Sequence, residues 1–378
     1  MKKKIFLSAG DVSGDMHAAY LIKKLIKKSP DLLVSAIGGS KLEEVNINFL
    51  VNIAQSQSFG FNGLLRKYIY FKNILKNTVI SHFEKQKPDL VILVDFYGFN
   101  IHIAKEAKKK NIPVVYYISP QIWASRKWRI RQIKKYVNSV IAIFPFEKEI
   151  YEKENMSVFY VGHPLVDIIS EEREEIDVYE KLGIDKNKKL IGLLPGSRNS
   201  EVRYILPMFL ECIKNINNKD VVYLLFISSS INRSFINELL KNYNLENEIK
   251  IIEGPAYNIR KQLRFCLTSS GTATVENTIL KIPMMIFYKM PKFTYFMARV
   301  LVKVDFIGMP NILANKLIMP EFIQNINIKE ASYVMQNWID KDETLYNLKK
   351  DLHVIQSQLG DEGVLDKICD YVLKFSHR

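Results

Sequence analysis

The fold of this chain is decided by the stretch Lys189-Leu190-Ile191-Gly192-Leu193-Leu194-Pro195-Gly196-Ser197-Arg198. Its apolar part, residues 189–194, predicts a short buried strand, and the amphipathic segment near 201–216 predicts a helix. A glycine turn between a strand and a helix presents the unpaired amides of the helix N-terminus, where the helix dipole favours an anion. Arg198 adds a planar, permanently charged donor group suited to phosphate. The sequence therefore predicts a phosphate-binding turn at Gly196, Ser197 and Arg198.

A second turn of the same kind lies near the N-terminus. The apolar residues 3–7 lead into a loop with two glycines, and a helical pattern follows over residues 16–28. The loop residues considered for substrate binding are Gly10, Asp11, Ser13, Gly14 and Asp15. Two strand–glycine–helix starts in one chain predict an α/β fold of two Rossmann-like, doubly wound domains that face a cleft.

The length of 378 residues is too great for one ordinary domain and fits two. Apolar strands alternate with amphipathic segments, which predicts a mostly parallel sheet in each domain. We place the first domain at residues 1–168 and an interdomain crossing in the charged stretch 169–187. The second domain follows at 188–341, and a helical tail at 342–378 is expected to pack across both domains.

The net charge of +14, from 54 basic and 40 acidic residues, favours an anionic partner: nucleic acid, an acidic lipid surface or a phosphorylated substrate. The three cysteines, Cys212, Cys266 and Cys369, have no metal-site spacing, which argues against a zinc site and for a reducing compartment. No uncharged apolar run reaches the ~18 residues of a membrane span, and the first apolar stretch is too short for a signal peptide. We therefore expect a cytoplasmic protein that contacts membranes only at their surface.

A carboxylate, Asp95, ends the apolar strand predicted at residues 90–94. Ligands of open α/β sheets bind beyond the carboxyl ends of the strands. A half-buried carboxylate at such an edge could accept a proton from a substrate hydroxyl, and it could equally cap the next helix. The sequence alone leaves both roles open.

A second candidate site segment is Ser270-Gly271-Thr272, which follows an apolar strand near 266–269. Glu276 lies one turn beyond Thr272 on the same helix face, where a carboxylate could accept bonds from two ribose hydroxyls. A Ser-Gly-Thr loop is by itself a common helix start. Its occurrence in the same predicted domain as Gly196-Ser197-Arg198 favours a shared nucleotide site.

Two segments combine aromatic and basic side chains. Residues 121–129 fit single-stranded nucleic acid, an anionic lipid interface or a packed helix. Residues 59–71 fit either a buried helix or an amphipathic element at a bilayer surface. The members of the second segment that would face lipid are Phe59, Phe61, Leu64, Leu65, Arg66, Lys67 and Tyr68. Two histidines, His17 at a helix start and His163 at a turn, are weaker candidates for a substrate contact.

Several short motifs follow one another in a distinctive order along nearly the whole chain. They are Ala9-Gly10-Asp11-Val12-Ser13-Gly14-Asp15, Ser119-Pro120-Gln121-Ile122-Trp123-Ala124, Pro145-Phe146-Glu147-Lys148, Gly162-His163-Pro164, Leu194-Pro195-Gly196-Ser197-Arg198 with Glu201, Ser270-Gly271-Thr272-Ala273 with Glu276, and Pro310-Asn311-Ile312-Leu313-Ala314. This ordered set resembles the bacterial lipid-A-disaccharide synthases. The resemblance implies a glycosyltransferase fold of the B type.

The resemblance also implies an activity. The family transfers a 2,3-diacylglucosamine unit from its UDP donor, UDP-2,3-diacylglucosamine, to 2,3-diacylglucosamine 1-phosphate (lipid X), with inversion at the anomeric carbon. The family requires no metal ion or other cofactor. The resemblance also implies peripheral attachment to the anionic inner face of the inner membrane, and a homodimer that exchanges C-terminal elements. Nucleic acid is not among the expected partners.

Residue roles follow from the same match. Asp95 is the proposed general base on the acceptor 6-hydroxyl, and Arg198 stabilises the departing UDP diphosphate. The residues implied on the donor side are Gly196, Ser197, Ser270, Gly271 and Thr272 for the phosphates, Glu276 for the ribose, Glu253, Pro255 and Tyr257 near the uracil, and Asn311, Glu321 and Gln324 in a late donor-side segment. Residues 59–71 match the element that docks on the membrane and faces the acyl chains.

The chain departs from the family pattern at two places. Asp11 stands where the family usually has glutamate, and Gly98 stands where many members have a second acid near Asp95. Two other interpretations stay open: another UDP-sugar enzyme of the same fold, such as a peptidoglycan glycosyltransferase or a UDP-sugar epimerase, and a basic nucleic-acid-binding protein. The last would leave both phosphate turns and Asp95 unexplained.

Overall fold

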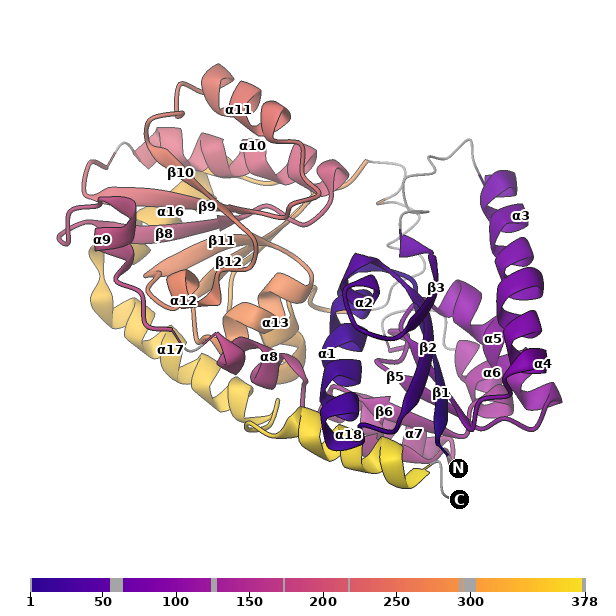
Figure 1. Cartoon of the computed structure of the whole chain (residues 1–378). Coiled ribbons are helices and arrows are strands. Elements are labelled where there is room, and N and C mark those ends of the chain that lie inside the picture. Colours follow the sequence, from indigo (N-terminus) through magenta and orange to yellow (C-terminus); the bar gives the residue numbers. More distant parts are fainter. Residues whose placement is uncertain are drawn as a thin grey trace. The chain divides into compact units, whose positions relative to one another are not determined.

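The computed structural model describes residues 2–54, 64–123, 128–172, 174–216, 218–291, 295 and 304–375. The chain forms two compact units (Figure 1). The first runs to Ile168 and includes the chain from Leu359 onward, and the second is Ile169–Gln358. The helical tail is therefore divided, because α17 (Asp342–Ser357) belongs to the second unit and α18 (Val364–Phe375) to the first.

The first unit is built on a sheet of seven parallel strands in the order β3-β2-β1-β4-β5-β6-β7. The strands are β1 (Lys4–Ala9), β2 (Leu33–Gly38), β3 (Asn48–Asn52), β4 (Leu90–Val94), β5 (Val114–Tyr117), β6 (Ser139–Ala142) and β7 (Val158–Tyr160). All five residues of β4 are buried, as expected of a central parallel strand that is covered on both faces. The order reverses between β1 and β4, so Asp95, which follows β4, lies at a switch point of the sheet.

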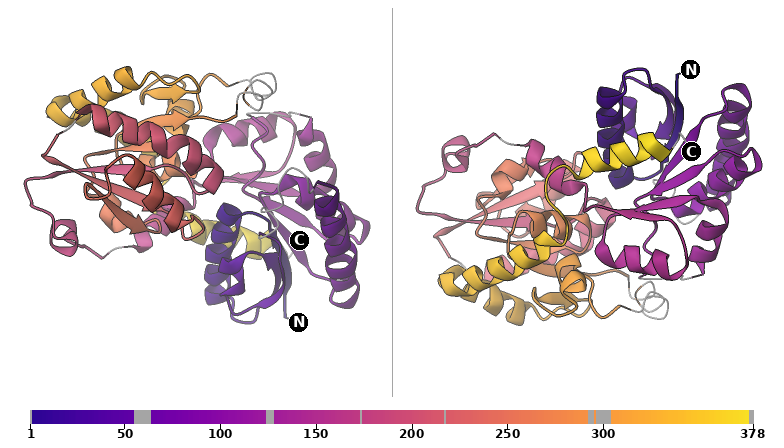
Figure 2. Two further views of the ribbon diagram at one scale, coloured as in Figure 1. Left: turned by 90° about the horizontal axis from the view of Figure 1, so that it is seen from above. Right: turned by 90° about the horizontal axis from the view of Figure 1, so that it is seen from below.

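Helices cover both faces of this sheet (Figure 1). They are α1 (Val12–Lys28), α2 (Ser40–Glu43), α3 (Leu64–Ile74), the π-helical turn η3 (Leu75–Ile80), α4 (Ser81–Lys85), α5 (Tyr97–Lys109), α6 (Arg129–Tyr136), α7 (Pro145–Lys153) and α18. Helix α8 (Leu165–Glu171) begins in the first unit and ends in the second. Phe6, Val91 and Tyr116 belong to the core beneath α5 and α6. On the opposite face α18 lies beside α1 (Figure 2), where Lys28 pairs with Asp370 at 2.7 Å.

The second unit is a sheet of six parallel strands in the order β10-β9-β8-β11-β12-β13. The strands are β8 (Lys189–Leu194), β9 (Val221–Ile227), β10 (Ile249–Glu253), β11 (Phe265–Ser269), β12 (Met284–Tyr288) and β13 (Glu321–Ile323). The helices are α9 (Val178–Leu182), α10 (Asn199–Ile216), α11 (Arg233–Asn242), α12 (Tyr257–Arg260), α13 (Thr272–Ile279), α15 (Met309–Ala314), α16 (Ile328–Asp340) and α17. Helix α10 packs beside α16 on one face and α13 beside α17 on the other (Figure 1).

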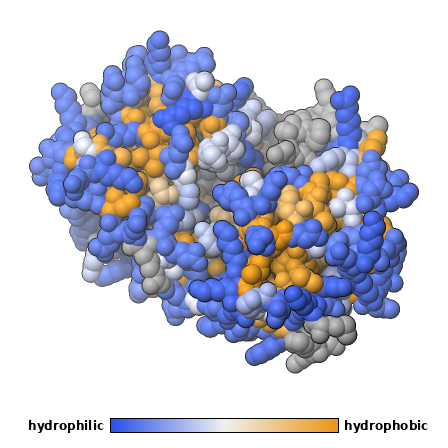
Figure 3. Space-filling view, in the orientation of Figure 1, coloured by the Kyte–Doolittle hydropathy of each residue, from blue (hydrophilic) through white to orange (hydrophobic). Residues whose placement is uncertain are grey.

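The predicted fold class, two doubly wound α/β halves, is confirmed by these two parallel sheets. The chain between 169 and 187 includes α9, whose Val178 is buried in the core of the second unit. Hydrophilic side chains cover most of the described surface on the face seen in Figure 3, with apolar residues in smaller patches. Over the described ranges, no helix is both long and apolar enough to cross a membrane.

Candidate functional site

The donors of the turn between β8 and α10 bind a carboxylate of the protein itself, that of Glu201. The backbone N–H of Ser197 donates to Oε2 of Glu201 at 3.1 Å, and Nη1 of Arg198 donates to Oε1 of the same carboxylate at 3.0 Å. Gly196 has a φ of +124°, and a Cβ there would lie 2.6 Å from Glu201 Oε2. Only glycine therefore allows this approach. The donors predicted to take a phosphate converge on one negatively charged group.

The second turn of this unit lies at the same edge of the sheet, because β8 and β11 are neighbouring parallel strands. Gly271 has a φ of +148° and precedes the first residue of α13, Thr272. The hydroxyl of Ser270 donates to the carbonyl of Ile307 at 2.8 Å, so this side chain holds the loop before α15. The backbone of 270–272 and the hydroxyl of Thr272 are the groups of this turn that suit a phosphate.

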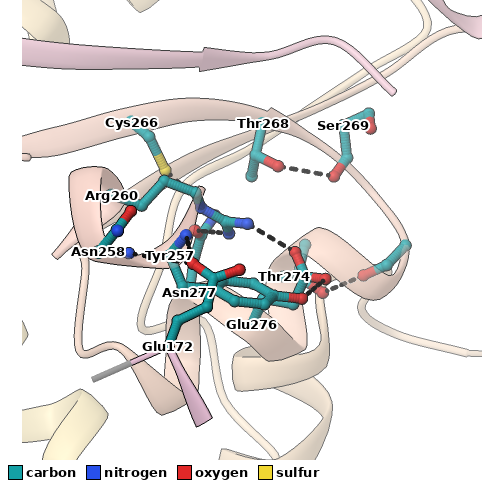
Figure 4. Close-up of polar contacts among 11 residues, drawn as sticks. Glu172, Tyr257, Asn258, Arg260, Cys266, Thr268, Ser269, Thr274, Glu276 and Asn277 are labelled. Atoms are coloured by element: carbon teal, nitrogen blue, oxygen red, sulfur yellow. Dashed lines mark hydrogen bonds and ion pairs between the residues drawn. The ribbon is translucent and has the colours of Figure 1, made fainter. Parts of the chain in front are cut away.

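A buried network surrounds Glu276, one turn into α13 (Figure 4). Its Oε1 accepts a hydrogen bond from the hydroxyl of Tyr257 at 2.9 Å, and its Oε2 accepts one from Nη1 of Arg260 at 2.7 Å. Nη2 of Arg260 donates to Oδ1 of Asn277 at 2.5 Å. Burial raises the pKa of Tyr257, and the Glu276 carboxylate raises it further, so the tyrosine stays a hydroxyl donor. The sequence analysis missed Arg260, because its burial depends on packing against α13.

The three residues implied near the uracil lie in different surroundings. Glu253 ends β10, is exposed and pairs with Arg233 at 2.5 Å. Pro255 is exposed in the loop before α12. Tyr257 is 2% exposed, with its ring beneath the Arg260 guanidinium and its hydroxyl on Glu276. Glu253 and Pro255 are therefore accessible to a base, whereas the Tyr257 ring is buried.

The late donor-side residues bond mainly to the protein. Asn311 is fully buried, accepts from the backbone N–H groups of residues 318 and 319, and donates to Glu321 Oε1 at 2.7 Å. The Glu321 carboxylate also accepts the N–H groups of Ile307 and Gly308, at 3.0 and 2.8 Å. The side-chain amide of Gln324 exchanges two hydrogen bonds with the backbone of residue 290. These side chains shape the loops beside the Ser270–Thr272 turn.

In the first unit, Asp95 directly follows β4 in a constrained backbone. Asp95 and Phe96 both have positive φ, 43° and 45°. The Asp95 carbonyl accepts from the hydroxyl of Tyr116 at 2.6 Å and from Nδ2 of Asn100 at 2.8 Å. Consecutive left-handed residues other than glycine are costly and concentrate at functional sites. These bonds fix the backbone from which the half-buried Asp95 side chain projects.

The glycine loop of the first unit is mainly structural. Asp11 caps α1 by accepting the N–H of Gly14 at 2.6 Å. Asp15 is 3% exposed and accepts the backbone N–H groups of residues 39, 41 and 42, which secures the start of α2. A Cβ at Gly10 would lie 2.0 Å from the ring of Phe96, so this glycine makes room for the residue after Asp95. Ser13 is half-buried in the first turn of α1.

A second carboxyl group of the first unit, that of Glu147 at the start of α7, is buried. Glu147 is 2% exposed, and its Oε2 accepts the N–H groups of Ile143 and Phe144 at 3.1 and 3.3 Å. Burial raises the pKa of Glu147 to about 7; the two amide bonds oppose this rise and the charge of Asp95 adds to it. The motif containing Glu147 was found in the sequence, but nothing in the sequence showed that the side chain is buried.

The two histidines belong to the core. His17 and His163 are each 3% exposed, and their ring centroids are 5.9 Å apart. Burial lowers the pKa of His17 to about 4 and also lowers that of His163, so both rings are neutral at pH 7. Nδ1 of His163 accepts the N–H of Leu165 at 3.1 Å. Their geometry is accounted for by packing.

The segment predicted to face lipid is described only in part. Phe59 and Phe61 lie outside the described residues; Leu64 and Leu65 begin α3, and their side chains are not described. Arg66 is exposed and Lys67 is half-buried, while Tyr68 and Ile69 are 64% and 49% exposed. Residues 70, 71 and 74 of the same helix pack on the core. Helix α3 is therefore amphipathic, with aromatic and aliphatic side chains on its outer face.

The comparison with known families decides the assignment. A sequence model of the lipid-A-disaccharide synthetase family matches residues 5–364. The chain belongs to this family. It is 35% identical to the lipid-A-disaccharide synthase of Persephonella marina, over 99% of each chain. It is 37% identical to lipid-A-disaccharide synthase 1 of Legionella pneumophila strain Philadelphia 1, over 98% of this chain and 97% of the relative.

Solved structures with low sequence identity to this chain share its fold. A UDP-GlcNAc 2-epimerase from Neisseria meningitidis, bound to UDP-GlcNAc, matches with a TM-score of 0.69 and 17% identity over 98% of this chain and all of that one. The protein UGT89C1 of Arabidopsis thaliana, complexed with quercetin, matches with a TM-score of 0.65 and 10% identity over the full length of both. At this identity the likeness concerns the fold alone.

The departures from the family pattern have structural counterparts. A Cβ at Gly98 would meet no atom within 4 Å. Asp11 is long enough to cap α1. In the part of the chain that the structure describes, no three His, Cys, Asp or Glu side chains group as a metal site would require.

Proposed function

We propose that the protein transfers a 2,3-diacylglucosamine unit from UDP-2,3-diacylglucosamine to lipid X, giving the lipid A disaccharide 1-phosphate and UDP. The observation that supports this most strongly is the carboxylate of Glu201 bound by the Ser197 amide and the Arg198 guanidinium. A turn that gathers an amide, a guanidinium and the positive end of an 18-residue helix onto one anion is suited to a diphosphate.

The donor is proposed to lie along the carboxyl edge of the second sheet. Its phosphates occupy Gly196–Arg198 and the backbone of 270–272, and Glu276 accepts the ribose hydroxyls. The base lies near Glu253 and Pro255. Asn311, Glu321 and Gln324 act indirectly in this proposal, because their hydrogen bonds hold the neighbouring loops.

The reaction is proposed to proceed by one inverting displacement. Asp95 accepts the proton of the acceptor 6-hydroxyl as that oxygen bonds to the anomeric carbon, and the bond from this carbon to the diphosphate breaks. Negative charge develops on the departing UDP, where Arg198 and the turn amides are already oriented. Removing one such preorganised donor typically costs about 3–4 kcal/mol of barrier. No covalent intermediate and no metal ion is needed in this scheme.

Attachment to the inner-membrane surface belongs to the same proposal. Both substrates carry acyl chains on phosphorylated head groups, so the enzyme must meet them at an interface. The net charge of +14 favours an anionic surface, and the outer face of α3 presents Arg66, Tyr68 and Ile69. We propose a cytoplasmic, peripheral location and, from the family, a homodimer.

The decisive assay follows UDP release from UDP-2,3-diacylglucosamine with and without lipid X, together with the mass of the lipid product. We expect release to require lipid X and to match disaccharide formation. A UDP-sugar epimerase, the activity named for the Neisseria structure, would instead act on UDP-GlcNAc without any acceptor. UDP release that ignores lipid X, or epimerisation of UDP-GlcNAc, would contradict the proposal.

A further inference from the structure

The most deeply buried cation of the second unit, among the described residues, is Arg260 of α12. Its side chain is 2% exposed, whereas that of its partner Glu276 is 13% exposed. Figure 4 shows the guanidinium directed toward Glu276 and Asn277, with the ring of Tyr257 beside it. Burying a charge is costly, and a buried ion pair is often no more stabilising than apolar residues of similar size. A role beyond stability is therefore worth testing for this pair.

The guanidinium is also incompletely satisfied. Its Nη1 and Nη2 atoms donate to Glu276 and Asn277, but Nε is buried without a hydrogen-bond partner in the described part of the chain. An arginine retained only for stability would be expected to satisfy this donor as well. Instead, its hydrogen bonds are used to fix the orientation of the Glu276 carboxylate.

The fixed orientation of the Glu276 carboxylate determines which of its lone pairs can accept hydrogen bonds from a ligand. An ionised carboxylate offers about four acceptor positions on its two oxygens. Tyr257 uses one position on Oε1 and Arg260 uses one on Oε2. Among the residues that the structure describes, no other group bonds to these oxygens, so one position remains on each, and the side chain is 13% exposed. Two acceptor positions on one rigid carboxylate match the two neighbouring hydroxyls of a ribose.

Both partners of Glu276 are themselves fixed. The carboxylate of Glu172 accepts the backbone N–H of Tyr257 at 2.8 Å, which anchors the start of α12. Asn277, which receives Nη2 of Arg260, donates from its amide to the sulfur of Cys266 at 3.2 Å. Each of the two donors is thus held by a hydrogen bond of its own before any ligand binds, as preorganisation requires.

We propose that Arg260 and Tyr257 are positioning residues that hold Glu276 with one acceptor site free on each oxygen, and so set the preference for a ribonucleotide donor. This proposal rests on the assignment of Glu276 to the ribose in the proposed function. Neither residue touches the substrate. They act through the orientation and the charge of Glu276.

The test compares the affinities for UDP and 2′-deoxy-UDP by calorimetry. The variants are Arg260→Lys, which keeps a charge but cannot bridge Glu276 and Asn277, and Tyr257→Phe, which removes one hydroxyl. Matched controls are Arg264→Lys, an arginine that pairs with Asp342, and Tyr223→Phe, which removes a buried hydroxyl with no hydrogen-bond partner in the described part of the chain.

We expect the wild type to prefer UDP by about tenfold or more, as is typical of a hydrogen bond to a charged acceptor. In Arg260→Lys and Tyr257→Phe this preference should fall at least about threefold, while both controls keep it. The KM for the UDP donor should rise in the two variants, with kcat nearly unchanged at saturation. A purely structural role would weaken both nucleotides equally and leave their ratio unchanged, which would overturn the proposal.

The outcomes of these measurements distinguish a failure of this inference from a failure of the proposed function. If the wild type binds UDP and prefers it over 2′-deoxy-UDP, but the variants keep the wild-type ratio, only the positioning role is wrong. If the wild type binds both equally, the ribose role of Glu276 is wrong and the inference falls with it. If the wild type binds no UDP, the proposed function itself fails. Should Arg260→Lys not fold, the Tyr257→Phe ratio decides.

Discussion

The carboxylate of Glu201 occupies the donors that a diphosphate needs, so the substitution Glu201→Gln should tighten UDP binding. The glutamate accepts bonds from the Ser197 amide and the Arg198 guanidinium, and its side chain is 35% exposed, with that of Arg198 at 61%. UDP must displace the carboxylate before its phosphate can take these donors. Glutamine keeps the size of the side chain but removes the negative charge.

The size of the effect follows from exposure. An ion pair this open to solvent contributes on the order of 0.5 kcal/mol, and a displaced carboxylate about 4 Å from a phosphate adds roughly 1 kcal/mol of repulsion in water. Together they predict a gain of about 1.5 kcal/mol, or roughly tenfold in the Kd of UDP. The gain should shrink at high salt, because both contributions are screened.

Calorimetry of UDP binding to wild type and Glu201→Gln at two salt concentrations measures this directly. Glu211→Gln is the matched control, because it makes the same charge change about 15 Å further along the same helix. The control should leave the Kd of UDP within about twofold. Weaker UDP binding by Glu201→Gln would show that the glutamate supports the site rather than competing for it.

Three further predictions concern the first unit. Asp95→Asn should reduce transfer at least about a hundredfold while UDP binding stays at the wild-type value; an active variant would exclude Asp95 as the base. Glu147→Gln should remove a pH dependence of stability that the wild type has. In the wild type the native pKa of about 7 lies above the ordinary 4.5, so the native state binds more protons than the unfolded state between these pH values. The free energy of unfolding of the wild type therefore falls as pH rises from about 4.5 to 7. At about 1.4 kcal/mol per pH unit the wild type loses at most about 3 kcal/mol, and thermal melts at pH 5 and pH 8 should show the variant gaining on the wild type at the higher pH; equal shifts in both proteins would contradict the raised pKa. Replacing Tyr68 and Ile69 by serine should weaken sedimentation with anionic vesicles and leave UDP affinity unchanged, and unaltered sedimentation would remove α3 from the membrane contact.

Local patterns were enough to predict the glycine turn between β8 and α10; its role in phosphate binding stays a prediction. Gly196, Ser197 and Arg198 lie within one strand–helix connection, and their conformation depends on residues close in sequence, such as Glu201. The two doubly wound halves follow from the same alternation of strand and helix. The three-residue strand β13 was not predicted, because a strand so short carries no periodic signal.

The parts that were missed depend on contacts between distant residues. Asp15 was expected to face a substrate, but it binds amides some 25 residues further along the chain, at the start of α2. Arg260 lies in a four-residue helix, and its burial depends on packing against α13, which no local pattern reveals. The raised pKa of Glu147 likewise depends on burial by the surrounding fold. Charged residues whose role is set by tertiary packing are therefore the least predictable part of this site.

The central claim is that a uridine diphosphate binds to the two glycine turns of the second unit. A crystal structure of the protein with UDP tests it most directly. The account predicts phosphate oxygens within hydrogen-bonding distance of the Ser197 amide and the Arg198 guanidinium, the Glu201 carboxylate moved away from both, and the ribose on Glu276. UDP bound elsewhere, or Glu201 still on Arg198 with the nucleotide present, would contradict it.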